Sequence, residues 1–201
     1  MAKARPITGL DPWKPTGENA RLIVRERLAD MHTHAACIEN PENVQELHDL
    51  RIAVKRVRYT LEIFADFLPE TSKEFAAELA DLQDELGALH DSEVMLALLH
   101  RVLQQSRAVP EAGDENRPPA QQRKLLSLDM VEHLSHAARE SVLRAQEIQG
   151  LAGFLQRQEQ RRAQAYTSFL RHWESLEQRR FREALLQILD DEQTSPPGGS
   201  I

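Results

Sequence analysis

The chain of 201 residues has one cysteine, Cys37, and only 8 glycines, and aromatic residues make up 5 % of it. A single cysteine excludes an intramolecular disulfide and is typical of a reducing compartment. No run of about 18 apolar residues is present, so we expect no membrane-spanning helix. The polar start of the chain is followed by Pro6 and not by an apolar segment, so no signal peptide is predicted. These absences predict a soluble cytoplasmic protein.

The motifs of the common enzyme classes are also missing. The sequence contains no glycine-rich phosphate loop, no cysteine cluster and no GxSxG motif. His133 and His136 have i, i+3 spacing, but no carboxylate–histidine signature surrounds them, which favours surface histidines over metal ligands. We therefore predict a non-enzymatic protein with no catalytic residue, no metal site and no cofactor. The net charge of −7 further excludes a generic polyanion binder, so an anion site must be a local patch.

Helical periodicity is what the sequence has in abundance. Leu, Ala, Arg, Glu and Gln are prominent, and no alternation typical of a strand occurs. The predicted fold is all-α, a bundle of long antiparallel helices. We expect a lead-in over 1–17 in which Leu10 and Trp13 pack on the body, one helical domain over 18–192, and a disordered tail over 193–201. Helices are expected over 18–37, 41–68, 72–107, 121–149 and 154–191, with a loop over 109–119.

Glycine and proline positions refine these boundaries. Asn40 is a candidate N-cap with Pro41 at the first helical position. Gly87 is expected to end or bend its helix, and Gly150 and Gly153 to bend the chain before the last helix.

Residues 46–64 divide into two faces when each residue is given about 100° of rotation. One face is apolar. The other, roughly 110° away, carries a group that we call the first basic row, with Tyr59 at its edge. Like charges at i, i+4 repel one another, which costs helix stability unless an anion lies over them. This row therefore predicts an anion-binding face; its members are His48, Arg51, Lys55 and Arg58.

The last predicted helix carries a second line of cations. Residues 62–93 contain ten acidic residues and one basic residue, whereas 157–182 contain seven arginines and three glutamates. Three interpretations remain open: a solvated face, pairing of the arginines with the acidic segment, or an anion site shared with the first basic row. We call this line the second basic row; the members assigned to the site are Arg157, Arg161, Arg171 and Arg179.

Two motifs resemble those of CHAD domains, the conserved-histidine α-helical domains. Residues 48–62 read HDLRIAVKRVRYTLE and are similar to the signature helix, while residues 82–94 read LQDELGALHDSEV and are similar to the second motif. The resemblance is strong over 44–99 and weak over 155–190. Two departures stand in the second motif, where His90 replaces a frequent arginine and Ser92-Glu93 replaces a more acidic pattern.

The resemblance implies a bundle that binds inorganic polyphosphate through basic residues without catalysis. Family members commonly contain two four-helix repeats. This sequence shows each motif once, which implies one repeat with a helical insert near 120–149. A homodimer that supplies the second repeat and a shorter groove on a monomer are both open. The resemblance also implies that the protein is located in the cytoplasm, in association with polyphosphate granules.

Other functions remain as alternatives. The basic rows lack interleaved aromatic residues, which disfavours single-stranded nucleic acid because its bases need stacking platforms. A helical scaffold that binds a protein partner through the acidic segment 62–93 is one alternative. A metal-dependent phosphohydrolase that uses His48, His90 and Asp91 is another.

Overall fold

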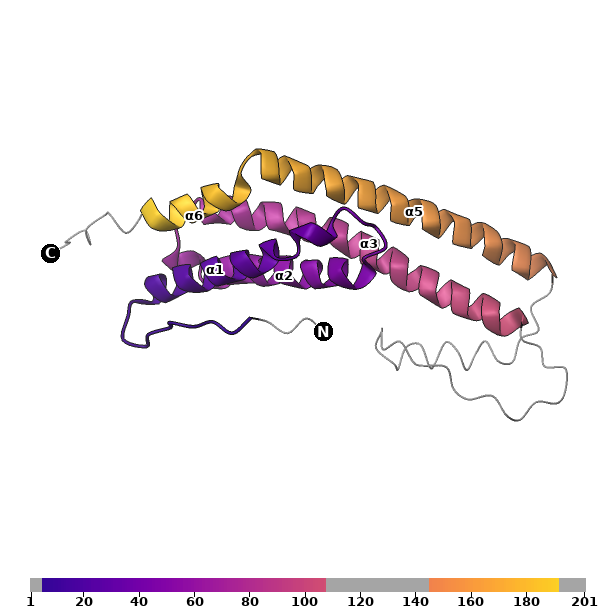
Figure 1. The fold of residues 1–201 in the computed structure, drawn as a ribbon, viewed down its shortest axis with the longest axis horizontal. Coiled ribbons are helices and arrows are strands. Elements are labelled where there is room, and N and C mark those ends of the chain that lie inside the picture. Colours follow the sequence, from indigo (N-terminus) through magenta and orange to yellow (C-terminus); the bar gives the residue numbers. More distant parts are fainter. Residues whose placement is uncertain (1–4, 108–144, 192–201) are drawn as a thin grey trace. The chain divides into compact units, whose positions relative to one another are not determined.

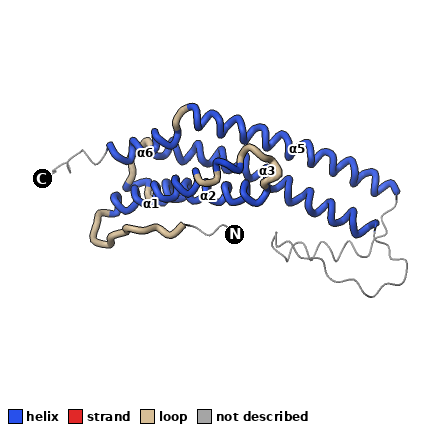
Figure 2. The backbone as a smooth tube through the Cα atoms, viewed as in Figure 1, coloured by secondary structure: helices blue, strands red, loops and turns tan. Residues whose placement is uncertain are grey.

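The computed structural model describes residues 5–107 and 145–191, and in these ranges the chain is mainly helical with no strand (Figure 2). The predicted all-α fold is confirmed. The predicted loop over 109–119, most of the helix expected over 121–149, and the tail over 193–201 lie outside the described residues. The α-helices are α1 Thr16–His32, α2 Val44–Ile63, α3 Ser72–Arg107, α5 Ala145–Gln178 and α6 Phe181–Asp191, and the 3-10 helices are η1 Ala35–Cys37 and η2 Ala65–Phe67.

The described residues form two compact units. Residues 5–90 and 164–191 make up the first, which we call the main unit, and residues 91–107 and 145–163 make up the second unit. Both α3 and α5 are continuous helices that contribute to both units. The single domain predicted over 18–192 stays a prediction.

Neighbouring helices of the main unit run antiparallel. His48 of α2 contacts His90 of α3. One turn further along α2, Arg51 lies beside Gly87, which is one turn nearer the start of α3, so the two helices run in opposite directions. Contacts between α3 and α5 follow the same rule. Helix α1 packs along α2, as Figure 1 shows, and also touches α6. The main unit is therefore a small antiparallel bundle.

The core lies where the apolar face of each helix meets its neighbours. The predicted stripe of α2 is confirmed, since Leu50, Val54, Val57 and Leu61 are each at most 1 % exposed. Burial of one such leucine contributes about 1.5–3 kcal/mol. Phe169 of α5 is fully buried beside Trp173, which in turn contacts His32 of α1, while the polar residue His172 contacts Glu85 of α3. Helix α5 therefore contacts both α1 and α3.

Several predicted boundaries are wrong by a turn. The first helix ends at His32, and Ala35–Cys37 form a separate 3-10 turn. Helix α2 begins at Val44 because the Asn40 side chain accepts a hydrogen bond from the N–H of Glu42 at 3.0 Å and so closes a turn. Asn43 occupies the N-cap position instead. Helix α2 also ends at Ile63 and not near Leu68.

The glycines that were expected to end or bend a helix end none, and the break that does occur lies elsewhere. Gly87 lies inside α3 and Gly150 and Gly153 lie inside α5, so none of them ends a helix. The long helix expected over 154–191 instead breaks after Gln178. Arg180 has a φ of 54°, a left-handed conformation that costs a residue with a side chain about 1 kcal/mol. Arginine is a good helix former, so its sequence position gave no signal of a break.

The lead-in is fastened by polar contacts. The side chain of Asn19 accepts a hydrogen bond from the N–H of Asp11 and donates one to its carbonyl. Trp13 is 93 % exposed and Leu10 is 48 % exposed, so the predicted packing of these two residues on the body is wrong. The hydrogen bonds at Asp11 hold the segment while Leu10 and Trp13 stay exposed.

Candidate functional site

The first basic row lies on α2, opposite part of the helix's buried face. Its ends, His48 and Arg58, are ten positions apart, which corresponds to about 15 Å along a helix. Lys55 is exposed, while His48, Arg51 and Arg58 are half-buried. Long basic side chains can lay their methylene groups on apolar neighbours while the charged ends stay within reach of water. The row therefore presents charge from a rigid element.

His48 and Arg51 lie where α2 meets α3. The imidazole rings of His48 and His90 have centroids 4.7 Å apart, with their planes inclined by 40°. Arg51 lies beside Gly87, since a Cβ placed on this glycine would be 3.9 Å from the Nε of Arg51. The Nδ1 of His48 and the Nε of Arg51 are buried and have no hydrogen-bond partner among the described residues. Burial lowers the pKa of His48, and the positive charge of Arg51 acts in the same direction.

Lys55 and Arg58 share an aromatic neighbour. The Nζ of Lys55 is 5.3 Å and the Cζ of Arg58 is 4.7 Å from the ring centroid of Tyr59. The Nε of Arg58 also lies 3.3 Å from a carboxylate oxygen of Glu62, four residues on. The Glu62 side chain is exposed, and i, i+4 ion pairs on a helix contribute only about 0.3–0.5 kcal/mol, so a polyanion can compete for Arg58.

Other charged groups on α2 point elsewhere. Arg56 lies 3.8 Å from the carboxylate of Asp30 on α1, so it faces away from the row.

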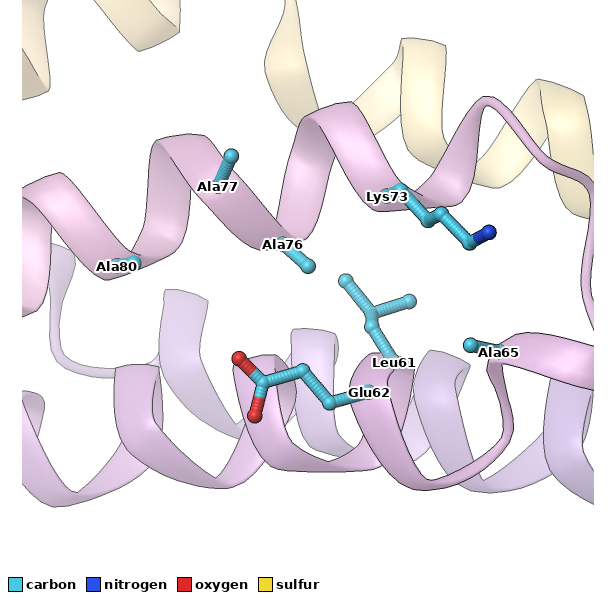
Figure 3. Close-up of a pocket in the computed structure, with 7 residues that line it drawn as sticks. All are labelled: Leu61, Glu62, Ala65, Lys73, Ala76, Ala77 and Ala80. Atoms are coloured by element: carbon cyan, nitrogen blue, oxygen red, sulfur yellow. The ribbon is translucent and has the colours of Figure 1, made fainter.

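An open pocket between α2 and α3 has Leu61 on its floor, with Glu62 and Lys73 at its edge (Figure 3). The ammonium group of Lys73 pairs with Glu70 at 2.8 Å. This pocket has an apolar lining and a carboxylate at its rim, which does not suit a phosphate chain.

The second basic row is divided between the two units. Arg157 and Arg161 belong to the second unit and are exposed, with the Cζ of Arg157 lying 5.7 Å from the ring centroid of Phe154. Arg171 belongs to the main unit and is exposed. Arg179 follows the last residue of α5 and donates a hydrogen bond to Glu78 of α3 at 2.7 Å. Pairing with the acidic segment, one of the three open interpretations, is therefore observed for Arg179.

Helix α3 presents different sides to the two rows of the main unit. Glu78 and Glu85 contact α5, whereas Gly87 and His90 contact α2. At about 100° per residue these two pairs lie roughly 160° apart around α3. No described contact in the main unit joins the first basic row to Arg171 or Arg179. Binding by either row stays a prediction.

Two polar contacts of the main unit were not foreseen. The hydroxyl of Ser168 donates to one oxygen of Glu85 at 3.1 Å, and the Nδ1 of His172 lies 3.0 Å from the other oxygen. Ser168 and His172 are four residues apart and so share a side of α5. That spacing is visible in the sequence, but their partner on another helix is not. The cluster joins α5 to α3 through one carboxylate.

Metal-binding clusters and membrane-spanning helices are both absent from residues 5–107 and 145–191. No group of three or more His, Cys, Asp or Glu side chains in these ranges could hold a metal ion. His133 and His136 lie outside them. No described helix combines the length and the apolar character needed to cross a membrane.

Comparison with known proteins gives one family. The family described as CHAD domain matches residues 3–100. No curated protein and no solved structure gives a significant match. The matched range contains α1, α2 and most of α3, and therefore the whole first basic row, but it does not reach the second basic row.

Proposed function

Because residues 3–100 belong to the CHAD domain family, which is associated with polyphosphate, we propose that the chain binds inorganic polyphosphate through the first basic row. The observation that carries this proposal is the row itself. Three permanent cations and one histidine follow each other along α2. Among the described residues, Arg51 and Lys55 have no carboxylate within ion-pair distance.

The chemistry of the row suits a linear chain of phosphates. The planar guanidinium groups of Arg51 and Arg58 can each donate two parallel hydrogen bonds to phosphate oxygens, while Lys55 acts as a point charge. A spacing of about 15 Å along the helix allows several phosphate groups of one chain to be bound together. Arg157, Arg161, Arg171 and Arg179 are proposed as additional phosphate contacts.

A double charge reversal tests the proposal. We expect Arg51→Glu with Arg58→Glu to abolish retention on immobilised polyphosphate, with unchanged helicity by circular dichroism. The neutral pair Arg51→Gln with Arg58→Gln avoids burying a carboxylate and is expected to weaken retention strongly. Arg101→Glu with Arg180→Glu is the matched control, because both residues are exposed, lie outside the proposed site and change the net charge equally. Retention of the first variant at the wild-type level would defeat the assignment.

The proposal includes binding without catalysis. Incubation with polyphosphate and a divalent cation is therefore expected to release no orthophosphate; release that depends on His48 would favour the phosphohydrolase alternative. We also propose a cytoplasmic location with association with polyphosphate granules. A homodimer that completes a longer basic path is a further part of the proposal. Mass-resolved chromatography with and without polyphosphate, at two salt concentrations, measures its stoichiometry.

A further inference from the structure

Two imidazole rings meet at the point where the first basic row touches α3. His48 of α2 and His90 of α3 lie with ring centroids 4.7 Å apart, and the Nδ1 atom of each ring is buried. Arg51 stands one turn along α2 on the same side, beside Gly87. Two helices therefore bring one permanent cation and two titratable rings to the same place.

Burial and nearby charges together set the pKa of His48 before a ligand binds. On α2, Asp49 favours the protonated ring and Arg51 opposes it, while burial is the largest effect and lowers the pKa. The carboxylate of Asp49 also accepts a hydrogen bond from Gln45 at 3.1 Å. On α1, Asp30 lies against Arg56, and on α3 the facing group is His90. The net effect lowers the pKa of His48, which favours the neutral ring at neutral pH.

We propose that His48, His90 and Arg51 form a phosphate subsite that takes up a proton when a phosphate group binds, with His90 as a ligand-binding residue; this rests on the proposed binding of polyphosphate. An oxyanion placed against the rings favours the imidazolium form, because a nearby opposite charge raises the pKa of a histidine. The proton comes from the solvent, and the phosphate stays intact. The oxyanion then accepts hydrogen bonds from the guanidinium group and from the protonated ring.

Proton uptake links affinity to pH. For each proton taken up, the association constant rises by at most about tenfold per unit decrease in pH, over the range between the pKa values of the free and bound states. Polyphosphate of long chain length is the suitable probe, because its internal phosphate groups stay singly charged throughout this range. The wild type is therefore expected to bind several-fold more tightly at about pH 6 than at about pH 8.

Calorimetry measures the proton directly. Titration of the full chain with long-chain polyphosphate, in two buffers of different ionisation enthalpy at one pH, gives the number of protons bound per binding event. We expect the wild type to take up protons, His90→Gln to take up fewer protons and to bind less tightly because the subsite has lost one ring, and His100→Gln to behave as the wild type. His100 is an exposed histidine of the same helix and is therefore the matched control.

A second measurement needs no substitution at the pair. Histidine ring resonances followed by NMR across the pH range should show the pKa of His48 rising when polyphosphate is added. Binding without proton uptake, or uptake that is equal in wild type and His90→Gln, would overturn the subsite and leave the proposed function intact. Absence of polyphosphate binding to the wild type at every pH would overturn the proposed function itself.

Discussion

Tyr59 is the side chain whose role changes most between sequence and structure. It was placed at the edge of the first basic row, and the structure puts its ring under both Lys55 and Arg58. A ring that faces two cations restrains two flexible side chains at once, and each cation–π contact at an exposed site contributes about 0.5–1 kcal/mol. Tyr59 is thus a positioning residue for the proposed site.

Replacement of Tyr59 separates the ring from the hydroxyl group. We expect Tyr59→Leu to weaken polyphosphate binding about twofold to fivefold, because Lys55 and Arg58 lose their shared neighbour. Tyr59→Phe keeps the ring and is expected to bind within about twofold of the wild type. Equilibrium titration of both variants at one salt concentration provides the comparison. Equal losses in both would instead assign the effect to the hydroxyl group.

His32 is a second histidine whose surroundings matter. Its side chain is 15 % exposed, its Nε2 is buried without a partner among the described residues, and its ring lies 5.9 Å from that of Trp173. Burial lowers the pKa of His32, and Arg182 acts in the same direction, while Glu177 opposes the change. Folding therefore favours the neutral form of this ring.

The sign of the pH effect follows from this lowered pKa. In the unfolded chain His32 keeps its ordinary pKa of 6.5, so below that pH the unfolded state binds the proton more readily than the folded state. The free energy of unfolding should therefore fall as the pH drops from about 7 to about 5. We expect a shallower fall for His32→Gln in urea unfolding, and an unchanged fall for His100→Gln. Identical slopes in all three proteins would contradict the prediction.

Helices α3 and α5 contain glycines well inside their ends, at Gly87, Gly150 and Gly153. A Cβ at Gly87 would lie at an ordinary contact distance of 3.9 Å from the nearest atom outside the helix backbone, and one at Gly150 would meet nothing within 4 Å. Alanine is favoured over glycine inside a helix by about 0.5–1 kcal/mol. Neither glycine is required by the space around it.

Substitution by alanine should consequently stabilise the protein. We expect Gly87→Ala and Gly150→Ala each to raise the free energy of unfolding by up to about 1 kcal/mol, measured by urea denaturation. Polyphosphate binding should be unchanged in both. A destabilised Gly87→Ala variant beside a stabilised Gly150→Ala variant would show that Arg51 needs the space over Gly87.

Features of the helices that follow from spacing along one helix could be predicted from the sequence, whereas features that depend on local turns or on other helices could not. The buried face of α2 was correct because burial of one side imposes a regular spacing on Leu50, Val54, Val57 and Leu61. The predicted start of α2 was wrong because Asn40 and Asn43 are residues of the same type and equally suited to the N-cap position, and only a local turn decides between them. The break at Arg180 carries no turn residue in the sequence, and the helix that follows it, α6, contacts α1, a tertiary contact that spacing along one helix does not reveal.

The candidate site was predictable only in part for the same reason. The first basic row is a property of one helix, and the helical period places its members on one side. The neighbours of the row, Gly87 and His90, come from α3 and follow from helix pairing. The pairing of Arg179 with Glu78 likewise joins residues about a hundred positions apart, and spacing along one helix cannot reveal it.

The whole chain has a net charge of −7, but part of its positive charge is concentrated in the two basic rows. A polyanion is therefore repelled by most of the chain and attracted by a few places, which makes its affinity sensitive to screening. The first basic row supplies three permanent cations, and the assigned arginines of the second row supply four more.

The salt dependence of binding reports how many of these cations take part. By analogy with single-stranded nucleic acids, the slope of log K against log salt is about −0.7 per neutralised phosphate. Binding by the permanent cations of the first row alone gives a slope of about −2, whereas participation of all seven gives about −5. We expect a value between these limits that moves toward −2 in a variant with Arg157, Arg161, Arg171 and Arg179 replaced by Gln. A slope near zero would rule out an electrostatic site.

The two tryptophans lie in different surroundings, so they give the protein two distinguishable fluorescence signals. Trp13 is 93 % exposed on the lead-in, so its emission should be red-shifted and quenched by iodide in the native state. Trp173 is 7 % exposed in the core, so its emission should be blue-shifted and shielded until the bundle opens. Excitation of a Trp13→Phe variant therefore yields an optical record of core opening alone, without any added label.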